Sequence, residues 1–171
     1  MPEVDPENAA PEAVQDAAEI SDESGRESYT ASLLSQGQHR FYTLSMPSDI
    51  LAVSCMVEPR YLDPAEGFQR ALDEKRARDI AAYIDSGTGT IPSSIVLSAQ
   101  PEAELQYNRP NRTLSFARIP RAFLILDGQH RVYGFRLATS KLRVPVVIYN
   151  GLSRTEEARL FMDINTRVRT H

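Results

Sequence analysis

Apolar runs along the chain predict a set of short β-strands. Runs rich in β-branched and aromatic residues favour strands, because such side chains pack well on a pleated surface. Two further strands are expected around a polar turn, in "ELQYN" and "RTLSFA". The clearest single strands are "RFYTLSM" at 40–46, "SSIVLSA" at 93–99, "RAFLILD" at 121–127 and "VPVVIY" at 144–149.

Residues 64–86 carry the clearest helical pattern. One broad side is apolar and basic side chains cover much of the rest, and Gly87 is expected to end the helix. The basic residues are interpreted as a solvated helix face, with contact to phosphates as the alternative. The apolar side consists of Phe68, Leu72, Ile80, Tyr83 and Ile84, and the basic residues are Arg70, Lys75, Arg76 and Arg78.

Two further helices are expected in the second half of the chain. In "GQHRVYGFRLATSK", Val132, Phe135 and Leu137 are available for the core, and Ser153 with Glu156 forms a capping box that opens "RTEEARLFMDIN". The run "ILAVSCMV" fits either a strand or a buried helical turn. Strands and helices in this mixed order predict an α+β domain, with an α/β arrangement as the alternative.

Charge divides the chain into an acidic head and a mildly basic body. Residues 1–27 hold nine acidic side chains and one basic one, whereas residues 28–171 hold 14 acidic and 18 basic ones. The head is rich in Pro and Ala and has no aromatic residue, so it cannot bury enough apolar surface to offset the entropy lost on ordering. We therefore expect residues 1–28 to be disordered, or to form a short helix around 11–20, and residues 29–171 to form one domain.

Several classes of protein are disfavoured by what the sequence lacks. Cys55 is the only cysteine, which rules out an internal disulfide, and we interpret it as a buried small hydrophobe rather than a nucleophile. The three histidines show no zinc-ligand spacing, so no zinc is expected. No apolar run approaches the ~20 residues that span a bilayer, and the N-terminus lacks the pattern of a signal peptide. A cytoplasmic protein with no membrane partner is expected.

The tetrapeptide GQHR occurs twice, at residues 37–40 and 128–131, without a longer repeat around it. The second copy follows a predicted buried strand that ends on Asp127. The first copy follows Gln36 in "SLLSQ", which is no clear strand, and leads into "FYTLSMP". We interpret His39 and Arg40 as the polar entry to a strand, with an accessory role at the site of the second copy as the alternative.

The second copy gathers several chemical groups where a strand hands over to a helix. Free backbone N–H groups at a helix start favour anions, and Gly128 permits close backbone approach. Asp127 can hold a hydroxyl, a metal-bound water or a helix N–H, while Gln129 and His130 offer hydrogen bonds of either polarity. The forked guanidinium of Arg131 suits phosphate. The alternative is a polar turn in which Asp127 caps the helix and Arg131 pairs with a neighbouring acid.

The segment "ILDGQHRVYG" resembles the signature of the DGQHR-domain proteins, a group that includes the DndB regulators of DNA phosphorothioation systems. Flanking segments resemble the same family: "FYTLSMP" as an early strand, "RALDEKRARDIAAYI" before "IPSSIVLSA", and "FMDIN" at 161–165 as an F-x-x-IN box. The resemblance covers about residues 36–169. Proteins of this family usually continue well beyond the IN box, so we expect either a truncated form or a chain without a further C-terminal region.

The resemblance implies a fold and a site. The fold would be a ParB/sulfiredoxin-like mixed sheet with packed helices. Gly128, Gln129, His130 and Arg131 would line a phosphate pocket, with Asp127 placed for a metal or water. Further contacts implied for this pocket come from Asn165 and, as an accessory residue, Asp163. Arg76, His39 and Arg40 are accessory candidates on the residue patterns described above.

The resemblance also implies ligands and partners. The wider group includes proteins that bind or hydrolyse nucleoside triphosphates, so the expected cofactor is an NTP with Mg²⁺. A catalytic form would hydrolyse the NTP with Asp127, His130 and Arg131, since a metal lowers the pKa of bound water and Arg131 stabilises charge on phosphate. Expected partners are DNA, a nucleotide, or proteins of a DNA modification or defence system. The alternative is a non-enzymatic module that regulates by binding DNA or protein, with a purely structural DGQHR turn.

Overall fold

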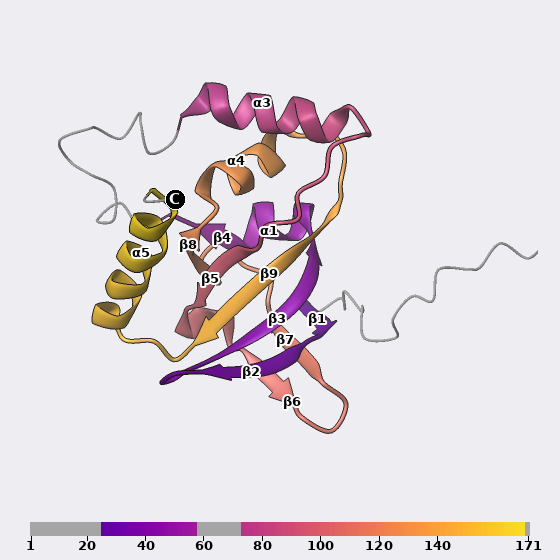
Figure 1. Ribbon diagram of the computed structural model, residues 1–171. Helices are drawn as coiled ribbons and strands as arrows, with labels where there is room; N and C mark the ends of the chain where they lie inside the picture. Colours follow the sequence, from indigo (N-terminus) through magenta and orange to yellow (C-terminus); the bar gives the residue numbers. More distant parts are fainter. Residues whose placement is uncertain (1–24, 58–72, 170–171) are drawn as a thin grey trace, which may run out of the picture.

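The computed structural model describes residues 25–57 and 73–169, which form an α+β domain with two sheets (Figure 1). The predicted α+β class is confirmed. The helices are α1 Ser48–Ser54, α3 Glu74–Asp85, α4 Gln129–Leu137 and α5 Arg154–Arg169, with a 3₁₀ turn at Pro101–Ala103. The strands are β1 Arg26–Thr30, β2 Ser32–Gln36, β3 His39–Pro47, β4 Cys55–Met56, β5 Ile95–Ala99, β6 Gln106–Asn108, β7 Thr113–Ala117, β8 Phe123–Asp127 and β9 Arg143–Asn150.

The larger sheet is mixed and has the strand order β2-β3-β9-β5-β8-β4. The pairs β9–β5 and β8–β4 are parallel, and the other three pairs are antiparallel. The pairing of β5 with β8 shifts register between Val96 and Leu97, next to the partner of Asp127. Such an irregularity changes the local direction of the backbone at the C-terminal end of β8, and bulges of this kind are common near functional sites.

The smaller sheet is antiparallel, has the order β1-β7-β6, and covers part of the core. Alternation along its strands turns Tyr29, Leu114 and Phe116 inward, where they are buried. Phe116 stacks on Tyr29 at 5.9 Å and meets Phe123 of β8 edge to face at 4.8 Å. Because burying a large apolar side chain contributes about 1.5–3 kcal/mol, these aromatic contacts join the two sheets firmly.

Helices α1, α3 and α4 pack on one another at one end of the larger sheet, and α5 lies against β8 (Figure 1). Helices α3 and α4 approach each other closely at Gly134, in the middle of α4. A Cβ atom on Gly134 would lie 2.7 Å from Cγ2 of Ile80 and 3.1 Å from the carbonyl oxygen of Ala77. Glycine at this position therefore allows α4 to approach the backbone of α3.

Most of the predicted elements are present, and one ambiguity is settled. The run "ILAVSCMV" is divided between α1 and the short strand β4. The capping box forms, with Ser153 and Glu156 each accepting the other's backbone N–H at 3.1 Å. Gly87 follows the end of α3 with φ 78°, as expected of a helix stop.

Some sequence predictions differ from the structure. Of the helix predicted over 64–86, residues 64–72, with Phe68, Leu72 and Arg70, lie outside the described residues, and the described helix begins at Glu74. Leu137, expected in the core, is 42% exposed at the last position of α4. Tyr83, on the predicted apolar side of its helix, is 48% exposed, and its hydroxyl accepts the backbone N–H of Thr90 at 3.0 Å. The segment "SLLSQ", which showed no clear pattern, is strand β2, paired with β3 through the turn at Gly37. That strand is mostly exposed, which explains the missing apolar signal.

The predicted disordered head extends too far at its C-terminal end. Residues 26–28 belong to β1, and Glu27 is buried at 3% exposure. Its carboxylate accepts hydrogen bonds from the Tyr29 hydroxyl at 2.8 Å and from Arg118 at 2.6 Å. Arg118, far away in the sequence, therefore neutralises the charge of Glu27, an acid that composition assigned to the head. Residues 1–24 lie outside the described residues.

Two expectations about chemistry can be compared with the structure. Cys55 is buried, and burial raises the pKa of its thiol to about 12, so the thiol stays protonated at neutral pH. It is therefore the small buried hydrophobe that we predicted rather than a nucleophile. Among the described residues, no helix is long and apolar enough to cross a membrane.

The contact at Gly134 generates a stability prediction. Gly134→Ala should lower the free energy of unfolding by about 1–3 kcal/mol, because the added methyl group overlaps Ile80 and the backbone of α3. Urea unfolding measures the change. In a double-mutant cycle with Ile80→Ala, the two effects should be less than additive, since the second change removes part of the overlap. Strictly additive effects would contradict the close approach.

Candidate functional site

A buried glycine makes the junction between β8 and α4. Gly128 has φ 104° and ψ 23°, and a Cβ atom there would lie 2.7 Å from Cδ1 of Ile95. Because of both these dihedral angles and this contact, any other residue at position 128 would destabilise the fold. Helix α4 starts directly afterwards, with the Val132 N–H bonded to the Gly128 carbonyl at 3.0 Å. The predicted strand-to-helix junction is therefore present.

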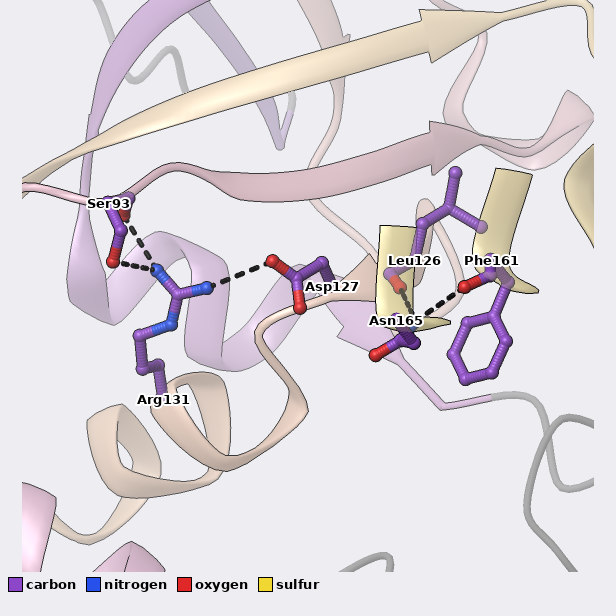
Figure 2. Close-up of polar contacts among 6 residues, drawn as sticks. All are labelled: Ser93, Leu126, Asp127, Arg131, Phe161 and Asn165. Atoms are coloured by element: carbon purple, nitrogen blue, oxygen red, sulfur yellow. Dashed lines mark hydrogen bonds and ion pairs between the residues drawn. The ribbon is translucent and has the colours of Figure 1, made fainter. Parts of the chain in front are cut away.

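The side chain of Arg131 reaches back from α4 to two strands (Figure 2). Nη1 donates to the carbonyl oxygen of Ser93 at 2.7 Å and to its hydroxyl at 2.8 Å, just before β5. Nη2 lies 3.4 Å from Oδ2 of Asp127 at the end of β8. The guanidinium thus fixes the spacing of β5, β8 and α4, and the predicted pairing of Arg131 with a neighbouring acid is present.

His130 connects α4 to the start of α3. Its Nε2 accepts the backbone N–H of Asp73 at 3.2 Å, so the neutral imidazole carries its proton on Nδ1. Asp73 is itself the N-cap of α3, since its carboxylate accepts the N–H of Arg76 at 3.2 Å. Burial lowers the pKa of His130, and the nearby cation of Arg76 lowers it further against the opposing effect of Asp73. The neutral form is therefore favoured.

Arg76 lies close enough to influence both His130 and Arg131 electrostatically. Burial lowers the pKa of Arg131; the carboxylate of Asp127 opposes this, and the cation of Arg76 adds to it. Repulsion between two neighbouring cations favours any anion that binds between them. Arg76 is exposed, whereas the side chain of Arg131 is only 19% exposed. The predicted accessory residue Arg76 is thus beside the second GQHR copy.

Asn165 ties α5 to the last residues of β8. Its side-chain amide donates to the carbonyl oxygen of Leu126 at 3.1 Å and to that of Phe161 at 2.6 Å (Figure 2). Asn165 therefore lies next to Asp127, and its amide N–H groups are used by the backbone. Asp163 is exposed on the same helix, and within the described part of the chain no recorded contact links it to residues 127–131.

We call the group Asp127, Gly128, Gln129, His130, Arg131, Arg76 and Asn165 the DGQHR edge. It lies where β8 ends and β5 begins, beside the first turns of α3 and α4. Gln129 is half-buried, and no hydrogen bond of its side chain is recorded among the described residues. Also within those residues, no three His, Cys, Asp or Glu side chains gather in one place, and Asp127 is the carboxylate that the DGQHR edge itself contains.

The first GQHR copy lies elsewhere, which corrects its suggested accessory role. Asp127 aligns across the sheet with Thr43 of β3, and His39 is four residues further along that strand. Three strand spacings and four residues correspond to a separation of about 20 Å. The His39 ring instead contacts the ring of Tyr149 edge to face, with a centroid distance of 5.8 Å.

The other interpretation of the first copy is confirmed. His39 is the first residue of β3 and Arg40 follows it, so these two residues form the polar entry to a strand.

Two residues of the site were not found from the sequence. Ser93 holds Arg131 through its carbonyl and hydroxyl, and nothing in "IPSS" marks it for that role. Asp73 could have been identified as an N-cap, because it directly precedes a run of good helix formers. Its backbone contact to His130, 57 residues away, depends on tertiary structure alone.

Together the fold and the site define an α+β domain with a glycine-based strand-to-helix junction. The family model DndB, described as DNA-sulfur modification-associated, matches residues 29–171, and the chain belongs to this family. The predicted relationship is confirmed, and the family points to a role in DNA sulfur modification (phosphorothioation) systems. No curated protein and no solved structure matches the chain, and the ParB/sulfiredoxin likeness stays a prediction.

The two glycines of the GQHR copies provide a matched stability comparison. Gly128→Ala should lower the free energy of unfolding by about 2–4 kcal/mol, from backbone strain together with overlap with Ile95. Gly37 also has positive φ, at 56°, but a Cβ atom there meets nothing within 4 Å. Gly37→Ala should therefore cost about 1 kcal/mol, from strain alone. Equal losses in denaturant unfolding would show that the contact at Gly128 does not constrain the junction.

His130 generates a prediction of pH dependence. Its pKa is lowered in the folded state relative to about 6.5 in the unfolded chain, so the unfolded chain takes up a proton first as the pH falls. The stability that neutral His130 contributes is present above about pH 6.5 and is lost as the pH falls towards the folded pKa. Unfolding in urea should thus require less denaturant at pH 5.5 than at pH 7.5.

The variant His130→Gln tests the assignment. Glutamine offers an oxygen that accepts the Asp73 N–H and does not titrate, so the loss of stability between pH 7.5 and 5.5 should shrink. Asp85 and Glu156, whose pKa values are lowered by backbone hydrogen bonds, titrate below this window. A pH dependence as large as that of the natural chain would assign the effect to another group.

Proposed function

We propose that the DGQHR edge binds a phosphate group, and that this binding serves a DNA sulfur modification system. The observation that carries the proposal is the start of α4 beside two cations. Gly128 at the N-cap has no side chain to cap the first amides of the helix, Arg131 lies in its first turn, and Arg76 is close enough to lower the pKa of Arg131. Helix N-termini and guanidinium groups are the common protein ligands of phosphate.

A nucleoside triphosphate with Mg²⁺ is the form of ligand that the family resemblance favours. The half-buried carboxylate of Asp127 suits Mg²⁺, which is commonly held by one or two carboxylates together with phosphates and water. With a single carboxylate, the ion would enter together with the nucleotide rather than before it. When bound, Mg²⁺ neutralises phosphate charge and activates water; Arg131 would hold the phosphate, and Gln129 would orient it.

Hydrolysis would place a further demand on this site. The general base has to accept a proton from water, and neutral His130 uses Nε2 as an acceptor for Asp73. Asp127 is the remaining candidate base of the three, with Oδ2 of its carboxylate 3.4 Å from Nη2 of Arg131. The proposed catalytic set of Asp127, His130 and Arg131 therefore becomes Asp127 with Arg131, and His130 positions α3.

A second candidate function rests on the hydrogen bonds of the same side chains. Arg131, His130 and Asn165 all bond to backbone atoms of neighbouring elements, as a purely structural motif requires. In that case the domain would be a non-enzymatic module that binds DNA or a protein of the modification system. Arg131→Ala is expected to lower stability under either function, since it leaves Asp127 and Ser93 without their partner. That variant cannot discriminate between them.

Arg76 and Gln129 discriminate between the two functions, because within residues 25–57 and 73–169 neither side chain makes a hydrogen bond or ion pair that supports the fold. Calorimetric titration with ATP, GTP and CTP, with and without Mg²⁺, and with short duplex DNA identifies the source of the phosphate. Arg76→Gln and Gln129→Ala should each weaken binding about tenfold or more and leave the melting temperature nearly unchanged.

Arg78→Gln is the matched control for Arg76→Gln. Arg78 is an exposed arginine of the same helix, and its partner is Glu74 at 3.6 Å. Its replacement should leave ligand binding within about twofold of the natural chain. The phosphate proposal would be refuted if none of the ligands bound, or if Arg76→Gln behaved like this control. Release of phosphate from the bound nucleotide, measured in parallel, decides whether the site also hydrolyses it.

A further inference from the structure

The outer face of the three-stranded sheet has a hollow that is lined mainly by polar residues, together with Tyr107 and Pro110. Its hollow has a volume of about 630 Å³ and lies over β1, β7 and the β6–β7 hairpin. We call it the polar cradle. The β6–β7 hairpin lies at the other end of the molecule from α3 and α4 (Figure 1), so the cradle is separate from the DGQHR edge. The lining residues that matter here are Ser28, Ser115, Gln106, Thr113, Asn108 and Arg109.

Strand register arranges these side chains in rows across the sheet. Ser28, Ser115 and Gln106 are aligned partners on three neighbouring strands, and Thr113 and Asn108 form part of the next row. The residues between them, such as Leu114, point to the core, so the alternation is strict. The cradle therefore presents hydroxyl and amide groups at regular spacing, each able to donate a hydrogen bond.

The charge of the cradle is positive. None of its lining residues is acidic, and Arg109 stands at its rim. Arg112 lies in the same hairpin and is exposed. At the far end Arg26 donates to the Ser115 hydroxyl at 3.2 Å and pairs with Glu104 at 3.7 Å. An anion with oxygen acceptors complements this combination of cations and neutral donors.

The hairpin that carries Arg109 is held in place by its own hydrogen bonds. The side chain of Asn108 accepts the N–H of Asn111 at 3.4 Å, and Asn111 accepts the N–H of Thr113 at 3.1 Å. The carbonyl of Arg112 accepts the N–H of Ala31, which ties the turn to the chain after β1. The cradle is therefore a preformed surface, and little ordering entropy would be lost when it binds.

We infer that the polar cradle contacts the phosphodiester backbone of duplex DNA. Phosphate and sugar oxygens are contacted by arginine together with Ser, Thr, Asn and Gln side chains, which is the set present here. A protein partner would call for several apolar or aromatic anchors; of this kind the cradle has Pro110 and Tyr107, whose hydroxyl already donates to the carbonyl oxygen of Ala31. The DndB family, associated with DNA sulfur modification, supplies the DNA context. The inference does not depend on phosphate binding at the DGQHR edge.

Fluorescence anisotropy with a labelled duplex of mixed sequence, at two salt concentrations, tests this surface. Arg109→Glu should weaken binding about tenfold or more and reduce the slope of log K against log salt by about one, since one phosphate contact is lost. Ser28→Ala with Gln106→Ala removes two neutral donors and should weaken binding by a smaller factor at both salt concentrations. Melting temperatures establish that each variant is folded.

Two comparisons make the outcome specific to the cradle. Arg78→Glu changes the charge by the same amount on the exposed side of α3, and it should affect DNA binding several-fold less than Arg109→Glu. Titration of Arg109→Glu with ATP and Mg²⁺ should match the natural chain, so the cradle and the DGQHR edge can fail separately. Equal effects of Arg109→Glu and Arg78→Glu, or no binding of duplex by the natural chain at low salt, would overturn the inference.

Discussion

The absence of a side chain at Gly128 is the constraint on which the rest of this domain depends. Only glycine combines a φ of 104° with contact to Ile95, and this combination sets the direction in which α4 leaves β8. That direction then decides which residues α4 can reach. His130 meets the start of α3, Arg131 meets Ser93 just before β5, and Arg136 donates to the carbonyl oxygens of Ala52 in α1 and Cys55 directly after it. The short helix α4 thus connects α3, the start of β5 and α1 at one end of the fold.

An element of the fold could be predicted from the sequence where neighbouring residues in the chain determine it, and not where a distant residue does. The junction at residues 127–131 was predicted because a buried strand, an acid and a glycine follow one another in the chain. The same tetrapeptide at residues 37–40 forms a hairpin entry, because Gln36 ends an exposed edge strand there. Strand β1 was missed for the opposite reason. The acid Glu27 resembles its acidic neighbours in sequence, and only Arg118, 91 residues away, makes its burial favourable.

The roles of residues within the site show the same division between local and tertiary causes. Chemistry alone indicated that Arg131 suits phosphate, but its contacts to Ser93 could not be read from the chain, since they require β5 to lie beside α4. His130 is predicted to be a catalytic group, and the structure adds a contact that the sequence did not indicate, in which its Nε2 accepts a backbone N–H at the start of α3. Asn165 looked like a ligand contact, and its amide bonds to backbone. Residue type predicted where polar groups gather, whereas tertiary structure decided what each one binds.

Structural and binding roles of Arg131 are compatible because of the geometry of its guanidinium. The group has five N–H donors in one plane, and the recorded bonds to Ser93 and Asp127 use three acceptor atoms. Two donors therefore remain for a phosphate oxygen without loss of the contacts that hold β5 and β8. Lysine, with three donors on a flexible stem, could not span both strands and a ligand at once. The same arginine can thus fix the strands and leave an edge that accepts an anion.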